Sequence, residues 1–170
     1  HHPTPEDPNN VRLPHVLMDY FFMCQDDSKI LPMIGLKERQ CKMKFAHMVE
    51  EKGPNEYAIE QVKEDIESMG IRRMIVKTDQ ENSAKFLIKE IVDKREEGKT
   101  LVEESKKGSS GSNGIVEREV QEIEGAIRSL FMSLQERIGR KLDARERIVA
   151  FIPEYAAYLL NRLQQGDDGK

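Results

Sequence analysis

The chain has 170 residues, of which 38% are hydrophobic and 34% are charged, and its formal net charge is −4. This length fits one domain with a real hydrophobic core, and the composition excludes a disordered chain. No apolar run approaches the roughly 20 residues that a membrane span needs, and the acidic balance argues against a strongly basic nucleic-acid coat.

The first candidate functional residue lies within an apolar stretch near the amino terminus. Residues 1–13 contain three prolines and no apolar periodicity, which predicts an extended, flexible lead-in. Residues 15–23 are apolar on both alternating faces, which predicts a central strand covered on both sides. Asp19 lies in the middle of this stretch. A buried carboxylate requires a partner, so Asp19 is predicted either to bind a cation, to pair with a core Arg or to lie at a frayed strand end.

Two further strands are expected to continue from this one as an antiparallel meander. They cover residues 29–36 and 40–49, and the second alternates basic with apolar residues, as an edge strand with one solvated face does. His47 in this strand is interpreted as structural rather than catalytic. Cys24 and Cys41 lie in apolar surroundings and are predicted to be buried free thiols.

A crossover then brings a second carboxylate to the sheet. Apolar residues at helical spacing predict a helix over residues 56–69, and residues 71–78 predict a strand parallel to its neighbour. Asp79 follows directly, at the carboxyl end of a strand, where open α/β sheets place their ligands. A second helix is predicted over residues 82–97.

A third carboxylate follows a polar segment. Residues 100–102 are expected to form a short edge strand, and residues 103–114 (EESKKGSSGSNG) a flexible loop or an interdomain linker. The helical pattern restarts at residue 115 and places Glu117 in the first turn. There Glu117 either faces the sheet edge or serves as an ordinary partner of the helix dipole. Its apolar stripe comprises Val116, Val120, Ile123, Ile127, Leu130, Phe131 and Leu134.

The last part of the chain is predicted to be helical in two pieces. These cover residues 143–150 and 153–163, because Pro153 is acceptable in a first turn but not within a helix. Residues 166–170 are expected to form a polar tail.

Taken together, these residues resemble the catalytic core of retroviral and LTR-retrotransposon integrases. The resemblance rests on Asp19, on the segment 77–81 (KTDQE) and on the segment 112–118 (SNGIVER), which is similar to the family's S-N-G-x-x-E-R signature. Thirty-seven residues separate Asp79 from Glu117, a spacing similar to the family's. The resemblance covers residues 14–165 as the core and implies that residues 1–13 are the remnant of an upstream zinc module.

The resemblance implies an α/β fold of the RNase H-like type, with a five-stranded mixed sheet flanked by helices. It also implies that Asp19, Asp79 and Glu117 hold two Mg²⁺ or Mn²⁺ ions for phosphodiester hydrolysis and DNA strand transfer during integration. The enzyme would be a metal-dependent polynucleotidyl transferase and nuclease, unless the chain is an isolated or degenerate fragment without activity. Two alternatives stay open: a ribonuclease H-like nuclease, and a non-catalytic core that dimerises or binds a partner.

The expected partners are DNA and further copies of the chain, as a homodimer or higher oligomer, with no membrane. The expected contacts to nucleic acid are Lys106, Lys107, Asn113 and Arg118, and a basic cluster within residues 137–147 is a weaker candidate for phosphate contacts. Such a protein would act inside the cell, in the nucleus when its target is chromosomal DNA.

Overall fold

The computed structural model describes residues 13–22, 31–78, 81–95, 99–104 and 110–163. For residues 99, 103–104 and 110–119 it describes the backbone alone. Among the residues so described, no helix combines the length and the apolar character that crossing a bilayer requires.

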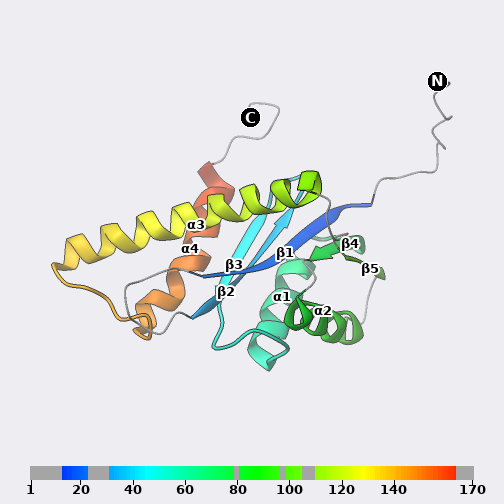
Figure 1. Cartoon of the computed structure of the whole chain (residues 1–170), viewed down its shortest axis with the longest axis horizontal. Helices are drawn as coiled ribbons and strands as arrows, with labels where there is room; N and C mark the ends of the chain where they lie inside the picture. Colours follow the sequence, from blue (N-terminus) through cyan, green and yellow to red (C-terminus); the bar gives the residue numbers. More distant parts are fainter. Residues whose placement is uncertain (1–12, 23–30, 79–80, 96–98, 105–109, 164–170) are drawn as a thin grey trace, which may run out of the picture.

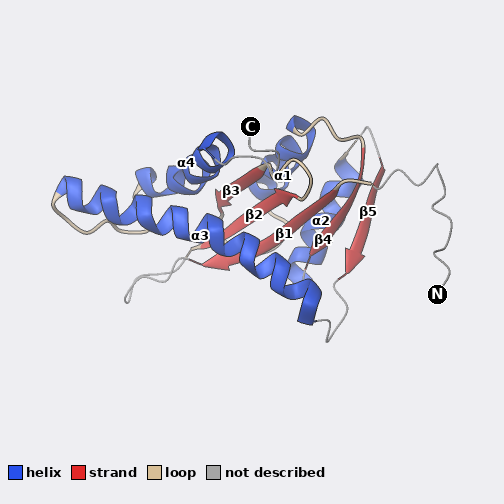
Figure 2. Ribbon diagram, turned by 90° about the horizontal axis from the view of Figure 1, so that it is seen from above, coloured by secondary structure: helices blue, strands red, loops and turns tan. Residues whose placement is uncertain are grey.

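A five-stranded mixed sheet forms the centre of the molecule, as the sequence predicts (Figure 2). The strands are β1 (His15–Phe22), β2 (Pro32–Glu38), β3 (Lys44–Met48), β4 (Arg73–Thr78) and β5 (Lys99–Glu104). Their order across the sheet is β3-β2-β1-β4-β5. The β1–β2 and β2–β3 pairs are antiparallel, and the β1–β4 and β4–β5 pairs are parallel. The predicted meander and the predicted parallel crossover are therefore both confirmed.

Two pairs of helices cover the two faces of the sheet (Figure 1). The helices are α1 (Glu56–Ser68), α2 (Asn82–Lys94), α3 (Ser110–Ile138) and α4 (Arg147–Leu163). Alternate residues of β1 divide between the two layers, because successive side chains of a strand point to opposite faces. Val16, Met18 and Tyr20 pack in the core with α1 and α2, and Phe21 packs in the core with α3 and α4.

The helical stripes predicted from the sequence form these two cores. Ala58, Ile59, Val62 and Ile66 of α1, with Ala84, Leu87, Ile88 and Ile91 of α2, are buried on one face. Ile123, Ile127 and Phe131 of α3 are buried on the other, together with α4. Burying each such side chain contributes on the order of 1.5–3 kcal/mol, so the stripes determine which side of each helix meets the sheet.

The helical part of the chain departs from the predictions at two places. α3 begins at Ser110, within the segment predicted to be a loop, so Glu117 lies beyond the first turn. Gly and Ser disfavour helix by at most about 1 kcal/mol each, whereas extending an existing helix adds one hydrogen bond per residue. α4 is one helix with Pro153 inside it, and residues 144–146 precede it as a turn and a bend rather than as helix. Ile152, Pro153, Ala156 and Ala157 are buried, and this packing offsets the hydrogen bond that Pro153 cannot donate.

The prediction for one cysteine and the bounds of two strands were also wrong. Cys41 is exposed, because it lies in the turn between β2 and β3 rather than in a strand. In that turn, the Glu38 carboxylate accepts hydrogen bonds from the backbone amides of Gln40 and Cys41. β2 accordingly continues to Glu38, and β3 begins only at Lys44. Cys24 lies outside the described residues.

Gly35 of β2 is required by close packing, and replacing it with Ala is expected to destabilise the protein by about 1–3 kcal/mol. A Cβ atom at this position would lie 3.0 Å from a ring carbon of Phe21, which is itself buried, and 3.8 Å from Cδ1 of Ile123. Urea unfolding measures the change. The matched control is Gly125→Ala in α3, where a Cβ meets nothing within 4 Å. That variant is expected to gain about 0.5–1 kcal/mol, since Ala favours a helix interior over Gly. A Gly35→Ala protein as stable as the wild type would contradict the packing argument.

Candidate active site

Asp19 lies in the central part of β1, opposite Gly35 of β2. It is partly buried and lines a small cavity with Leu17 of β1 and with Val120 and Ile123 of α3. Its Oδ1 atom accepts a hydrogen bond of 2.8 Å from the backbone N–H of Tyr20. Asp19 therefore belongs to the face of the sheet that α3 covers, at the junction of strand and helix.

The register of the sheet relates Asp19 to the end of β4. The last residue of β4, Thr78, pairs with Met18, the residue before Asp19. Asp79 follows Thr78 in the sequence and lies outside the described residues. The backbone of α3 includes Glu117, Asn113 and Arg118, whose side chains lie outside the described part. Lys106 and Lys107 also lie outside it.

The convergence of the three carboxylates therefore stays a prediction. Among the residues that the structure describes, no group of three or more His, Cys, Asp or Glu side chains could hold a metal ion. Two of the three ligands expected from the sequence, Asp79 and Glu117, are not among the side chains so described.

Two buried lysines on the sheet face that carries Asp19 were not identified from the sequence. Lys37 of β2 lines the same cavity as Asp19 and lies 3.8 Å from the carboxylate of Glu122 in α3. Lys44 of β3 pairs with Lys37 across the sheet, and its Nζ lies 3.4 Å from the same carboxylate. The face of the sheet next to Asp19 thus carries buried positive charge, balanced in part by Glu122. The alternation of the 40–49 segment had suggested that its basic residues face solvent, yet Lys44 is 0% exposed.

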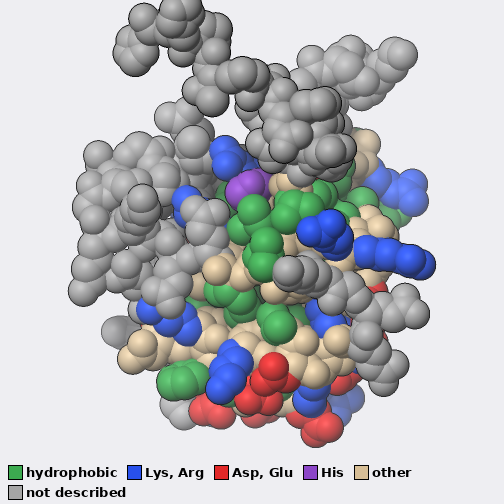
Figure 3. All heavy atoms as spheres, turned by 90° about the vertical axis from the view of Figure 1, so that its right-hand side faces the viewer, with side chains coloured by type: hydrophobic (Ala, Val, Ile, Leu, Met, Phe, Trp, Pro, Cys, Tyr) green, Lys and Arg blue, Asp and Glu red, His purple; other side chains and the backbone are tan. Residues whose placement is uncertain are grey.

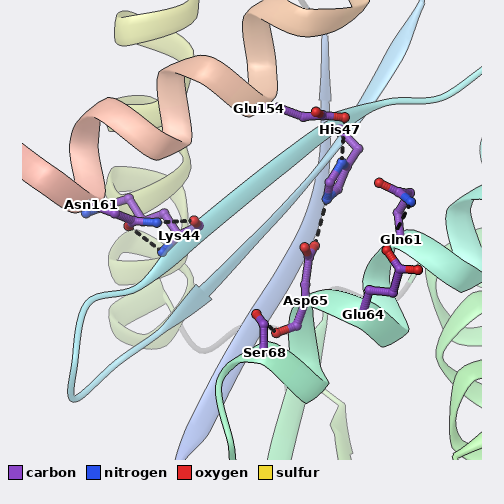
Figure 4. Close-up of polar contacts among 8 residues, drawn as sticks. All are labelled: Lys44, His47, Gln61, Glu64, Asp65, Ser68, Glu154 and Asn161. Carbon is purple, nitrogen blue, oxygen red and sulfur yellow. Dashed lines mark hydrogen bonds and ion pairs between the residues drawn. The ribbon is translucent and has the colours of Figure 1, made fainter.

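The backbone of Lys44 is held by the side chain of Asn161, from α4 (Figure 4). Asn161 Oδ1 accepts a hydrogen bond of 2.8 Å from the Lys44 N–H, and Asn161 Nδ2 donates one of 2.7 Å to the Lys44 carbonyl. One amide side chain therefore satisfies both backbone groups of an edge-strand residue, in the way that a neighbouring strand would.

A histidine between two carboxylates lies at the same edge of the sheet, among α1, β3 and α4 (Figure 4). His47 Nε2 lies 2.7 Å from Asp65 Oδ2 of α1, and Nδ1 lies 3.2 Å from Glu154 Oε1 of α4. Because each ring nitrogen faces a carboxylate, the charged imidazolium is the form that donates both bonds. His47 pairs with Ile34 of the α1–α2 core, on the other face of the sheet from Asp19. This arrangement supports the structural role that we predicted for it.

Stability is expected to fall as the pH rises through the folded-state pKa of His47. Burial lowers the pKa of His47, but the bonds and charges of Asp65 and Glu154 outweigh it, so the net change in pKa is upward. A His pKa raised by folding stabilises the native state below its unfolded value of about 6.5, and this stabilisation is lost above the folded value. Burial also raises the pKa of Asp65. A carboxyl pKa raised by folding likewise makes stability fall as the pH rises.

The measurement is the free energy of unfolding between about pH 6 and pH 9, for the wild type and for His47→Gln. The wild type should lose stability over this range more steeply than the variant. Equal slopes in the two proteins would show that His47 does not titrate above its unfolded pKa.

The basic cluster within residues 137–147 is partly neutralised by its own acids. Arg140 forms a bidentate pair with Glu146, at 2.7 and 2.8 Å. Arg140, with the backbone N–H of Asp143, lowers the pKa of Glu146 to about 2.

Figure 3 shows a different face, at the right-hand side of Figure 1, where Lys and Arg side chains lie around a central group of hydrophobic ones.

No family model and no curated protein matches the sequence. Solved structures do match. One is a simian T-cell lymphotropic virus intasome in complex with PP2A regulatory subunit B56 gamma, at 12% identity and a TM-score of 0.62. That match covers 89% of this chain and 49% of the other, so this chain spans about half the length of that one.

Two further matches are isolated catalytic cores. The HTLV-2 integrase catalytic core domain, in complex with magnesium and in dimeric form, is 11% identical, with a TM-score of 0.54 and 94% of both chains covered. The catalytic core domain of BIV integrase is 14% identical, with a TM-score of 0.51 and 90% of this chain and 88% of the other covered. At these identities the similarity concerns the fold, and it confirms that this chain has the RNase H-like fold of a retroviral integrase catalytic core.

Proposed function

We propose that this chain is an integrase-type catalytic core, which hydrolyses phosphodiester bonds and transfers DNA strands with Asp19, Asp79 and Glu117. One observation carries the proposal: Asp19 lies on the central strand, on the face that α3 covers, next to the parallel strand that leads into Asp79. Glu117 belongs to the same helix that covers Asp19. The similarity of the fold to integrase cores adds support.

The donor set fits a divalent metal. Carboxylate oxygens are the ligands that Mg²⁺ and Mn²⁺ prefer, and Asp19 is a partly buried residue that lines a small cavity. Asp19, Asp79 and Glu117 would hold such ions, which would supply Lewis-acid activation of the phosphodiester and of the oxygen that attacks it. In this scheme the protein supplies no covalent nucleophile. Its carboxylates supply the negative charge that binds the cations. The backbone N–H of Tyr20 donates a hydrogen bond that orients the carboxylate of Asp19.

The proposed partners follow from this chemistry. DNA ends and target DNA would contact Lys106, Lys107, Asn113 and Arg118, and copies of the chain would assemble into a dimer or higher oligomer. One structural neighbour was determined in a dimeric form and another in an intasome. Acting on chromosomal DNA, the protein would work in the nucleus.

An assay with two substrates tests the proposed function. The full chain is incubated with Mg²⁺ or Mn²⁺ and either a duplex DNA with a recessed end or an RNA–DNA hybrid. Cutting and joining of DNA, abolished by EDTA, supports the proposal. Hydrolysis of the hybrid alone would instead indicate a ribonuclease H-like enzyme. No reaction together with no metal binding would indicate a non-catalytic core.

The salt dependence of DNA binding tests the proposed DNA surface. With a net charge of −4 and part of the 137–147 cluster neutralised, few phosphates can be contacted, so we expect a shallow log–log slope of about −2 to −4. Changing Lys106 and Lys107 to Glu should weaken binding to all sequences alike, because phosphate contacts do not read bases. Fluorescence anisotropy across a salt series measures both effects.

The matched control for this double variant changes Lys89 and Lys94 to Glu. Both are exposed on α2, and the change alters the net charge by the same amount. A steep slope in the wild type, or equal weakening in both double variants, would show that DNA binds elsewhere.

A further inference from the structure

Lys52, in the loop between β3 and α1, contacts two segments that flank the proposed site. Its Nζ lies 2.7 and 2.9 Å from the two carboxylate oxygens of Glu81. The same ammonium group lies 4.8 Å from the ring centroid of Phe22 and 5.4 Å from that of Tyr20. These distances are within the range of cation–π attraction, so one cation is bound to an acid and to two aromatic rings.

The segments that Lys52 joins come directly after the two aspartates in the sequence. Tyr20 and Phe22 follow Asp19 on β1, and Glu81 is two residues beyond Asp79. Tyr20 and Phe22 alternate with Asp19, so Lys52 lies on the α1–α2 face of the strand, opposite the Asp19 cavity. Lys52 therefore contacts residues on the face of β1 opposite the proposed site and does not line the site itself.

Glu81 is anchored as well as charged. It stands at the N-cap of α2 but makes no side-chain cap bond there; its Oε1 accepts a hydrogen bond of 2.7 Å from Ser83 Oγ. Its backbone carbonyl accepts a hydrogen bond of 3.1 Å from the N–H of Lys85, which lies in the first turn of α2. Although burial alone would raise the pKa of Glu81, the hydrogen bonds from Lys52 and Ser83 lower it below its usual value.

The loop that carries Lys52 is itself fixed to β1. The hydroxyl oxygen of Tyr20, a buried residue, accepts a hydrogen bond of 3.0 Å from the backbone N–H of Gly53. Gly53 has φ of +113°, a conformation that residues with a Cβ rarely adopt. The position of Lys52 is thus set by its neighbour as well as by its own contacts.

We propose that Lys52 is a positioning residue for the metal-binding carboxylates: it clamps the start of α2 against the end of β1 and so sets the separation of the segments that carry Asp19 and Asp79. This inference rests on the proposed function. An ordinary surface ion pair contributes little to stability and nothing to a distant site. A clamp differs from it by changing ion affinity, because groups that orient metal ligands typically contribute 10–100-fold.

The test replaces Lys52 with Met, which keeps an unbranched apolar side chain and removes the charge over the rings. The first measurement is amide hydrogen exchange of the metal-free protein. The Lys85 and Gly53 amides should exchange several times faster in the variant, while that of Arg95, bonded to the Ile91 carbonyl at the other end of α2, should not change. The second is Mn²⁺ affinity by calorimetry, which should fall by about tenfold.

Two further variants separate positioning from general damage. Lys94→Met removes the partner of Glu60 in an ion pair between α2 and α1, at 4.0 Å, and should leave exchange at Lys85 and Mn²⁺ affinity unchanged. Lys52→Arg retains a cation that can bind Glu81 and stack on the rings, and should restore most of the affinity.

Unchanged exchange at Lys85 in Lys52→Met overturns the inference, and so does unchanged Mn²⁺ affinity. Equal losses in Lys94→Met also overturn it. Failure of the proposed function is seen separately, in the wild type: no Mn²⁺ binding there refutes the function, whatever the exchange rates show.

Discussion

Replacing Asp19 with Asn is expected to abolish metal-dependent DNA cutting and joining while leaving the protein folded. Asn has nearly the same shape, and its side-chain oxygen can still accept the bond from the N–H of Tyr20. What it loses is the negative charge that a divalent cation requires. Groups that only hydrogen-bond to a metal ligand typically contribute 10–100-fold to metal affinity or activity. Losing a ligand itself should therefore lower activity by more than about a hundredfold. Strand-transfer assays, Mn²⁺ calorimetry and thermal unfolding measure the three properties.

The same result is expected for Asp79→Asn. Asp93→Asn provides the control, because Asp93 is exposed on α2 and the substitution removes the same charge. Activity of the purified Asp19→Asn protein at the wild-type level would place the catalytic centre elsewhere in the chain.

Replacing Ile123 with Ala is expected to destabilise the protein by about 2–5 kcal/mol. Ile123 is 1% exposed and packs between α3 and the sheet, where it lines the cavity beside Asp19. Truncating it removes buried methyl groups and leaves a void that the sheet cannot close. Urea unfolding measures the loss.

Met132→Ala serves as the comparison on the same helix. Met132 is 63% exposed, so its truncation should change the free energy of unfolding by less than about 0.5 kcal/mol. Equal effects of the two substitutions would mean that α3 does not pack on the sheet through the face described.

The features that sequence alone predicted are those that depend on local periodicity. The apolar residues on either side of Asp19 in β1 and the helical spacing in α1, α2 and α3 required burial on particular faces, and the structure buries those faces. The Asp at position 19 was conspicuous because a carboxylate within such a run requires a partner. The helix between β3 and β4 predicted that β4 lies parallel to a neighbour in the sheet, and β4 is parallel to both β1 and β5.

The features that sequence did not predict depend on distant partners. His47 and Glu154 are 107 residues apart, and Lys44 and Asn161 are 117 apart, so no local pattern relates them. The basic residues of the 40–49 segment were predicted to face solvent. Lys44 is buried instead, because α3 and α4, which lie far along the chain, cover it. Lys52 was not singled out from the sequence, because the two rings that its ammonium group contacts belong to β1, and β2 and β3 lie between them in the chain.

The amide of Asn161 also determines where the sheet can grow. A strand at the end of a sheet offers unpaired N–H and C=O groups to strands of other molecules, which is a route to aggregation. At β3, α4 lies along the strand and Asn161 occupies the backbone groups of Lys44, so an incoming chain would have to displace a helix. At the opposite end of the sheet, β5 presents the exposed side chains of Leu101 and Val102. Edge-to-edge association of this protein should therefore proceed through β5, and a charged residue in place of Val102 is the most direct way to suppress it.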